Sequence, residues 1–118
     1  MKALPPSLRK RKRYIAFRFI GTGDIEKSEV SDVLKNTTIQ LFGELNAPKL
    51  RLIEFDGEAG MVMCEHSEVD KIKITLTLIE EINGKKVIPL ILGVAGTIKS
   101  CKRKYLEVLR NADSANGV

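Results

Sequence analysis

Apolar and polar residues alternate one by one in the first patterned segment of the chain, residues 14–20. Ile15, Phe17 and Phe19 fall on one face of this segment, while the opposite face mixes small, polar and apolar residues. Alternation of this kind, with aromatic and branched side chains, is typical of a strand that has one face in the core. We therefore expect a strand here, ended by Gly21.

Two segments in the middle of the chain carry apolar residues at helical spacing instead. The first covers residues 28–42, with Ser28 at the N-cap position and Gly43 as a C-terminal stop. The second begins at Ser67, and Asn83–Gly84 ends it. The apolar positions are Val30, Val33, Leu34, Leu41 and Phe42 in the first segment and Val69, Ile72, Leu76 and Ile79 in the second. Both segments predict amphipathic helices.

Three further apolar runs have the length of strands. Residues 50–56 and 61–66 are separated by a glycine-containing turn, and together they predict a hairpin. Residues 87–94 are almost continuously apolar, which is typical of a strand covered on both faces. Pro89 lacks an amide hydrogen for the ladder and favours a sheet edge at that point.

The last patterned segment begins at residue 98 and predicts an amphipathic basic helix. Its apolar residues fall on one face, and bases surround the rest. The apolar face consists of Ile98, Cys101, Tyr105, Val108 and Leu109, and the bases are Lys99, Lys102, Arg103 and Lys104. The tail, residues 111–118, has nothing to bury, and we expect it to be loose.

The order strand, helix, strand, strand, helix, strand, helix predicts an α+β fold. Its first six elements follow the split β-α-β pattern of the ferredoxin-like, RNA-recognition-like fold: an antiparallel four-stranded sheet with two main helices, here with an added C-terminal helix. We expect a basic N-terminal segment at 1–13 and a single domain at 14–110. The first and last strands are not expected to be neighbours, so the C-terminal helix has to carry its bases back towards the N-terminal ones.

The face of the predicted sheet that turns away from the two main helices carries Tyr14, Ala16, Arg18, Met61 and Met63. This face is too apolar to be left in water, and we expect the C-terminal helix or a partner protein to cover it. RNA-recognition domains stack bases on aromatic residues of their two central strands. The strand at 61–66 has no aromatic residue, so stacking across the sheet is not predicted.

Composition limits the class of protein. A chain of 118 residues with 43% hydrophobic and 30% charged residues fits one compact domain. No apolar run approaches the roughly 20 residues that cross a bilayer, and we expect neither a membrane-spanning nor a secreted protein. Cys64 and Cys101 are then expected to be reduced thiols of a cytoplasmic protein.

The distribution of charge points to a ligand class. Residues 1–23 carry seven bases and no acid, and residues 83–118 carry seven bases against two acids. Between them, residues 24–82 carry thirteen acids against six bases. Basic blocks at both ends of a chain favour a polyanion such as a nucleic acid. The alternative is an ordinary solubilising surface.

Catalytic signals in the chain are few. Cys64 and the single histidine, His66, lie two positions apart and would share one face of a strand, but no oxyanion or third-residue signal accompanies them. A structural role at the strand end is favoured over a thiolate nucleophile. Glu54, Asp56 and Glu58 are favoured as surface residues of a hairpin tip over ligands of a magnesium ion.

The approach to the last helix resembles a glycine-rich phosphate cradle only weakly. Gly93, Gly96 and Thr97 lead from a strand into a helix whose first amides are free to bind an anion, and Lys99 follows. The motif lacks the Lys-Ser/Thr ending of a nucleotide-binding loop. A phosphate of a nucleic-acid backbone and a tight strand-to-helix turn remain two open interpretations.

The motifs LPPSLRKRKRYIAFRF near the start and LGVAGTIKSCKRKYL near the end resemble the ribonuclease P protein component 2 family, also found in ribonuclease MRP, over about residues 4–109. The resemblance implies a noncatalytic subunit of a ribonucleoprotein that removes the 5′ leader from precursor tRNA, with the RNA as catalyst. By position it assigns RNA contacts to Arg9–Arg13, Lys99, Lys102 and Arg103. The full set of predicted RNA-binding residues is Arg9, Lys10, Arg11, Lys12, Arg13, Arg18, Gly96, Thr97, Lys99, Lys102, Arg103 and Lys104.

The same resemblance implies the partners. These are ribonuclease P RNA, ribonuclease P protein component 3 and, in the holoenzyme, precursor tRNA, with self-association left open. No cofactor is expected on the chain, because magnesium would act at the RNA active site. The alternative function is a ferredoxin-like protein-interaction or small-molecule-sensing domain whose bases only aid solubility, and a third is an enzyme that uses Cys64 and His66.

Overall fold

The computed structural model describes residues 11–21 and 24–109, and within them the chain forms an antiparallel sheet in the order β2-β3-β1-β5-β4. The strands are β1 (Lys12–Gly21), β2 (Leu50–Phe55), β3 (Ala59–Glu65), β4 (Glu81–Ile82) and β5 (Lys85–Ala95). The helices are α1 (Lys27–Phe42), the 3-10 turn η2 (His66–Glu68), α2 (Val69–Leu78), α3 (Ile98–Cys101) and the π-helical η3 (Lys102–Leu106). We call α3, η3 and the helical residues 107–109 the C-terminal helix.

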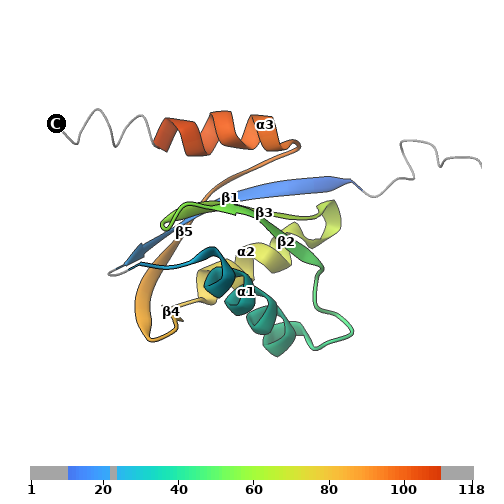
Figure 1. Ribbon diagram of the computed structural model, residues 1–118. Coiled ribbons are helices and arrows are strands. Elements are labelled where there is room, and N and C mark those ends of the chain that lie inside the picture. Colours follow the sequence, from blue (N-terminus) through green and yellow to red (C-terminus); the bar gives the residue numbers. More distant parts are fainter. Residues whose placement is uncertain (1–10, 22–23, 110–118) are drawn as a thin grey trace, which may run out of the picture.

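Helices cover both faces of the sheet. Figure 1 shows α1 and α2 on one face and the C-terminal helix on the other. The predicted α+β class and antiparallel sheet are therefore confirmed, but the prediction of four strands omitted β4. The four longer strands lie in the order β2-β3-β1-β5, and β4 extends the sheet at the β5 edge.

The extra strand comes from a turn that the sequence pattern assigned to a helix end. Asn83 and Gly84 have φ of 48° and 80°, the positive values that a tight hairpin turn requires. They connect β4 to β5 and do not end a helix, because α2 already stops at Leu78 and Ile79 is extended. The predicted second helix was therefore too long at its C-terminal end.

The first and last long strands are neighbours, so the expectation that they are separated was wrong. β1 lies at the centre of the sheet and pairs antiparallel with β5 from Tyr14 opposite Ala95 to Gly21 opposite Val87. Its other edge pairs with β3. Because β5 ends beside the start of β1, the C-terminal helix begins next to the bases that precede β1, and no long connection is needed to bring them together.

Each face of the sheet has its own apolar core. The core under α1 and α2 includes Ile15, Phe17 and Phe19, as the alternating pattern predicts. The second core lies under the C-terminal helix and contains Ala16, Ala59, Met61, Ala95, Cys101 and Leu106, all buried. The expected cover over the second face is thus confirmed as the C-terminal helix.

Helix boundaries differ from the predicted caps at two N-termini. At α1 the N-cap is Glu26, whose amide donates to Glu29 Oε1 at 3.2 Å, and Ser28 already lies in the first turn. Ser67 lies inside η2, one turn before α2. Gly43 is confirmed as the stop of α1, with its amide donating to Ile39 O at 2.8 Å.

The apolar run of β5 is covered on both faces only in part. At its β4 end, Ile88 is 62% and Leu90 41% exposed, because the C-terminal helix crosses the other half of the strand. Pro89 lies beyond the short pairing with β4, where β5 forms the sheet edge, as its missing amide hydrogen favours. No helix within the described ranges is long and apolar enough to span a bilayer.

Candidate nucleic-acid interface

The two basic blocks of the sequence meet where β1 and the C-terminal helix both begin. Tyr14 pairs with Ala95, so Lys12 and Arg13 lie beside the turn at Gly96. A Cβ on Gly96 would stand 3.9 Å from Arg13 Nη1. Arg9 and Lys10, which were also predicted to bind RNA, lie outside the described residues.

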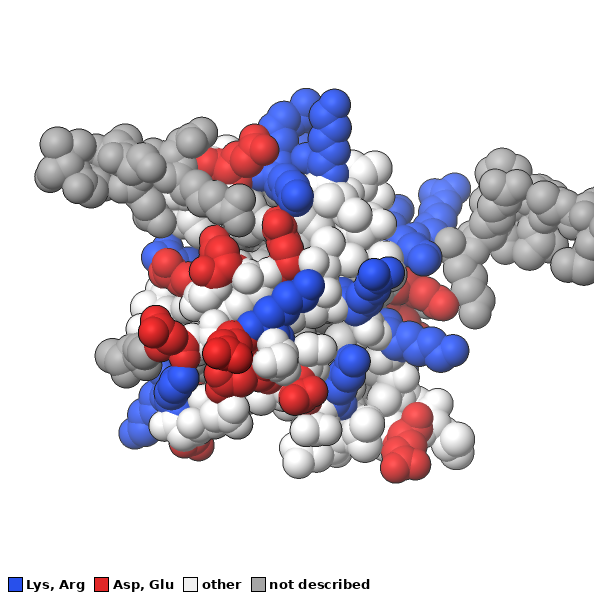
Figure 2. All heavy atoms as spheres, in the orientation of Figure 1, with Lys and Arg blue, Asp and Glu red and all other residues white. Residues whose placement is uncertain are grey.

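The bases of the C-terminal helix extend this surface. Lys99, Arg103 and Lys104 are exposed, and no carboxylate of the described residues forms an ion pair with them. Figure 2 shows blue side chains gathered over the start of the C-terminal helix and beside the start of β1. We call the described members of this group, Arg11, Lys12, Arg13, Lys99, Arg103 and Lys104, the basic surface. Glu65 lies opposite Lys12, but the six bases leave the surface with a net positive charge, which is suited to a polyanion.

Two predicted RNA-binding residues have carboxylate partners instead. Lys102 Nζ lies 3.8 Å from Glu54 Oε2, which ties the C-terminal helix to β2. Arg18 Nε donates to Glu58 Oε1 at 2.6 Å. Arg18 also stands six residues along β1 from Lys12, roughly 20 Å at about 3.3 Å per residue. The structure therefore does not bring Arg18 into the basic surface.

Arg51 is a base that the sequence analysis missed. It is exposed on β2 opposite Met63 of β3, and Met63 lies opposite Tyr14 of β1. These register pairs place Arg51 at the same end of the sheet as the basic surface. In the sequence Arg51 is an isolated base in the acidic middle of the chain, and only the strand register reveals its position.

The turn into the C-terminal helix is capped by a threonine side chain. Thr97 is the N-cap, and its hydroxyl accepts a bond from the Ser100 amide at 3.1 Å. Gly96 has room for a side chain, so no close backbone approach requires glycine there. Gly93 is required for packing, because a Cβ would stand 2.2 Å from the Tyr105 ring.

Cys64 and His66 are not arranged as a catalytic thiol and its general base. Cys64 is buried in the core under α1 and α2, and desolvation, with smaller contributions from Glu68 and Glu65, raises the pKa of its thiol to about 11. His66 is exposed and belongs to η2, so it does not share a strand face with Cys64. A neutral buried thiol is a poor nucleophile. Both cysteines are free, as expected of reduced thiols.

The acidic side chains at the tip of the β2–β3 hairpin bind backbone amides or bases of the protein itself. Asp56 Oδ1 accepts the amides of Glu58 at 3.0 Å and Ala59 at 2.8 Å, and Glu58 and Glu54 face bases. In the part of the chain that the structure describes, no three His, Cys, Asp or Glu residues are grouped to hold a metal ion. Asp56 therefore stabilises the β2–β3 turn, while Glu54 connects β2 to the C-terminal helix.

Comparison with known proteins identifies the family of the chain. Residues 13–106 match the profile of the Rpp14/Pop5 family. The chain belongs to the Rpp14/Pop5 family. It is 55% identical to ribonuclease P protein component 2 of Archaeoglobus fulgidus over 92% of this chain and all of that protein. It is 42% identical to the protein of the same name from Pyrococcus furiosus, over 89% of this chain and 91% of that one.

The fold of this Rpp14/Pop5 chain also has a solved neighbour. A chain in the cryo-EM structure of yeast ribonuclease MRP superimposes with a TM-score of 0.64, covering 92% of this chain and 95% of that one. The two sequences are 10% identical, so this likeness concerns the fold.

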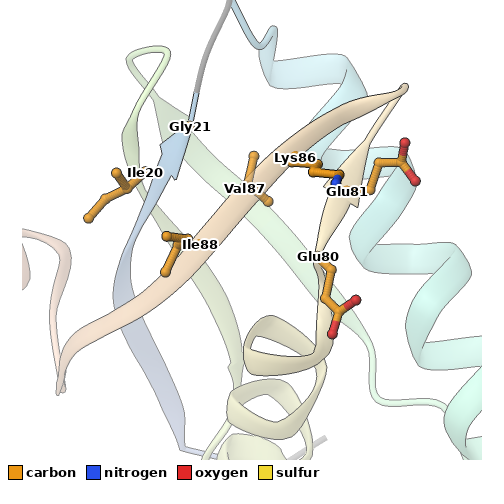
Figure 3. A pocket seen from close by; sticks show the side chains of 7 residues that line it. All are labelled: Ile20, Gly21, Glu80, Glu81, Lys86, Val87 and Ile88. Atoms are coloured by element: carbon orange, nitrogen blue, oxygen red, sulfur yellow. The ribbon is translucent and has the colours of Figure 1, made fainter.

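The opposite end of the Rpp14/Pop5 sheet has a different character. A hollow of about 720 Å³ lies there, between the end of β1 and the hairpin of β4 and β5. Figure 3 shows Ile20 and Ile88 on the two strands, and Glu80 and Glu81 on the neighbouring segment. Lys86 lines the hollow as well, so its charge is mixed, and the exposed isoleucines give it an apolar wall.

Proposed function

We propose that this chain is a protein subunit of ribonuclease P and that its basic surface binds the RNA of that particle. Family membership and the names of the relatives support the subunit role. The observation that carries the RNA contact is the pairing of Tyr14 with Ala95, which joins two base-rich blocks that are far apart in the sequence. The particle would process precursor tRNA by removing its 5′ leader. Reduced thiols fit a cytoplasmic location.

The chain is proposed to act as a noncatalytic support of the RNA. Within the described residues the thiols are buried, and no three His, Cys, Asp or Glu residues are grouped to hold a metal ion. Magnesium is proposed to act at the active site of the RNA. Purified chain without RNA is expected not to cleave precursor tRNA. Multiple turnover by the chain that survives nuclease treatment would contradict a supporting role.

Protein partners are proposed to bind at the hollow between the end of β1 and the β4–β5 hairpin. The exposed Ile20, Ile88 and Leu90 lie on paired strands and offer an apolar contact away from the basic surface. Ribonuclease P protein component 3 is the proposed partner, with precursor tRNA present in the holoenzyme and self-association as a further possibility. Binding RNA and protein at opposite ends lets the subunit connect the two.

The RNA contact is tested by charge reversal at matched positions. The double variant Lys99→Glu/Arg103→Glu changes the basic surface, and Lys27→Glu/Lys35→Glu makes the same net change at exposed lysines of α1. The first should weaken RNA binding and reduce the slope of log affinity against log salt by about 0.7 to 0.9 for each phosphate that the protein no longer neutralises. The second should keep the slope.

The N-terminal block is tested in the same titration. Replacing Arg9, Lys10, Arg11, Lys12 and Arg13 by alanine should also flatten the salt dependence, because each base that contacts a phosphate releases counterions. Equal slopes for all variants and the unmodified chain would show that these bases only solubilise the protein.

A further inference from the structure

Three side chains form a row across the sheet at the end where the basic surface lies. Arg51 of β2 is opposite Met63 of β3, and Met63 is opposite Tyr14 of β1. Residues that face each other across paired strands point to the same side. Two residues further along, Ala16 and Met61 are fully buried under the C-terminal helix. The row therefore faces the side of the sheet that this helix covers.

The row lies at the margin of that cover. Tyr14 and Met63 are half-buried and Arg51 is exposed, in contrast to the complete burial of Ala16 and Met61. Cys101 in the first turn of the helix approaches the Tyr14 carbonyl, with Sγ 3.7 Å from the oxygen. The Tyr14 ring, which packs against the edge of the second core, thus stands beside the helix start, and its hydroxyl has no hydrogen-bond partner among residues 11–21 and 24–109.

Positive charge surrounds this ring. Arg51 lies in the row, Lys12 is two residues before Tyr14 on the same face, and Lys99 is in the first turn of the C-terminal helix. The nearby acid is Glu65, opposite Lys12. Bases flanking a half-open aromatic ring suit a ligand that combines a flat ring with an anion.

We propose that Tyr14, Met63 and Arg51 bind one unpaired nucleotide of the RNA. The base stacks on the Tyr14 ring beside Met63, and the phosphates lie towards Arg51 and Lys12. β3 has no aromatic residue, which limits the row to a single base. In a duplex the bases are stacked on one another and do not reach the ring, so the site selects a single-stranded segment. This inference rests on the proposed function and names the form of RNA at the same surface.

The tyrosine content of the chain allows direct observation of the site. The protein has two tyrosines and no tryptophan, so the Tyr105→Phe variant leaves Tyr14 as its only strong fluorophore. Stacking of a base quenches tyrosine emission. A ten-nucleotide single strand should quench the variant, and a duplex of equal phosphate number should bind with little quenching.

Matched substitutions at Tyr14 separate the contribution of the ring to RNA affinity from that of the surrounding charge. Tyr14→Leu keeps apolar cover and should lower the affinity for the single strand by about five- to a hundredfold, with an unchanged salt slope. Tyr14→Phe keeps the ring and should bind as the unmodified chain does. Circular dichroism checks that both variants are folded, and Tyr105→Phe reports stacking without altering Tyr14.

The outcomes distinguish this site from the wider proposal. Equal single-strand affinity for Tyr14→Leu and the unmodified chain, or equal quenching by the duplex, would overturn the nucleotide site and leave RNA binding intact. Quenching by an acidic peptide but by no RNA would identify a protein contact and overturn it too. Failure to bind either RNA would overturn the proposed function itself.

Discussion

Gly93 and Gly96 stand three residues apart before the C-terminal helix, yet their surroundings tolerate a side chain very differently. A Cβ on Gly93 would meet the Tyr105 ring at 2.2 Å, and the Tyr105 hydroxyl donates to Val94 O at 3.3 Å. Gly96 is open, with Arg13 Nη1 as its first neighbour at 3.9 Å. The contact between Gly93 and Tyr105 therefore fixes the height of the helix above the sheet.

The Gly93→Ala substitution should lower the free energy of unfolding by about 1 to 3 kcal/mol, the usual cost of overpacking a close contact. The matched Gly96→Ala variant should stay within about 0.5 kcal/mol of the unmodified protein. Urea unfolding followed by circular dichroism measures both. Equal stability of the two variants would mean that the Tyr105 ring moves aside at no cost.

The buried thiols predict a loss of stability in alkali. Desolvation, with a smaller contribution from Glu54, raises the pKa of Cys101 to about 11, and Cys64 reaches about 11 as well, from an ordinary value of 9.0. Between pH 9 and 11 the unfolded chain therefore releases thiol protons that the folded chain keeps. Unfolding becomes easier as pH rises through this window, and the stabilisation is fully present below pH 9.

Cysteine-free variants isolate this effect from other groups that titrate in alkali. The drop in unfolding midpoint from pH 8.5 to 11 should be smaller for Cys64→Ala/Cys101→Ala than for the unmodified protein, although the variant starts from lower stability. Denaturant titrations at the two pH values provide the measurement. A drop of the same size in both proteins would assign the alkaline loss to other side chains.

At the scale of elements, the hydrophobic pattern predicted each long strand and both main helices. Local alternation reported which face of β1 enters the core, because Ile15, Phe17 and Phe19 pack under α1 and α2. It could not report strand order, which depends on contacts between distant residues. The sequence pattern therefore did not predict that β1 pairs with β5. It also did not predict that Arg51 lies at the same end of the sheet as the basic surface.

The turn at Asn83–Gly84 shows a second limit of local patterns. The same two residues end helices and form hairpin turns, because both tolerate positive φ. Replacing Gly84, whose φ is 80°, by alanine should cost about 1 kcal/mol and weaken the pairing of β4 with β5. Hydrogen exchange at Ile82 and Lys85 measures the pairing locally. Exchange as slow as in the unmodified protein would show that the turn tolerates a side chain.

For the whole molecule, charge geometry predicts how the proposed RNA-binding subunit would support a catalytic RNA. A folded RNA active site holds phosphates close together, and magnesium normally screens their repulsion. A protein that presents the basic surface on one side replaces part of that screening.

The chain, added with its partner protein to the catalytic RNA, should lower the magnesium concentration needed for half-maximal cleavage of precursor tRNA. Charge reversal at Lys99 and Arg103 should raise it again, and the Lys27/Lys35 control on α1 should not. A magnesium titration of cleavage rate compares the four reactions. An equal requirement with the reversed and unmodified subunits would indicate support through shape or partner recruitment.

β1 lies at the centre of the sheet, and neither of the strands that pair with it is the next strand in the sequence. Its partners are β3, which starts at Ala59, and β5, which starts at Lys85. On the ribosome, the N-terminal bases emerge first, long before the residues that complete their surface. A nascent chain that stops before Lys85 leaves one edge of β1 unpaired and lacks the bases of the C-terminal helix. The basic surface can therefore form only after the C-terminal helix has been synthesised.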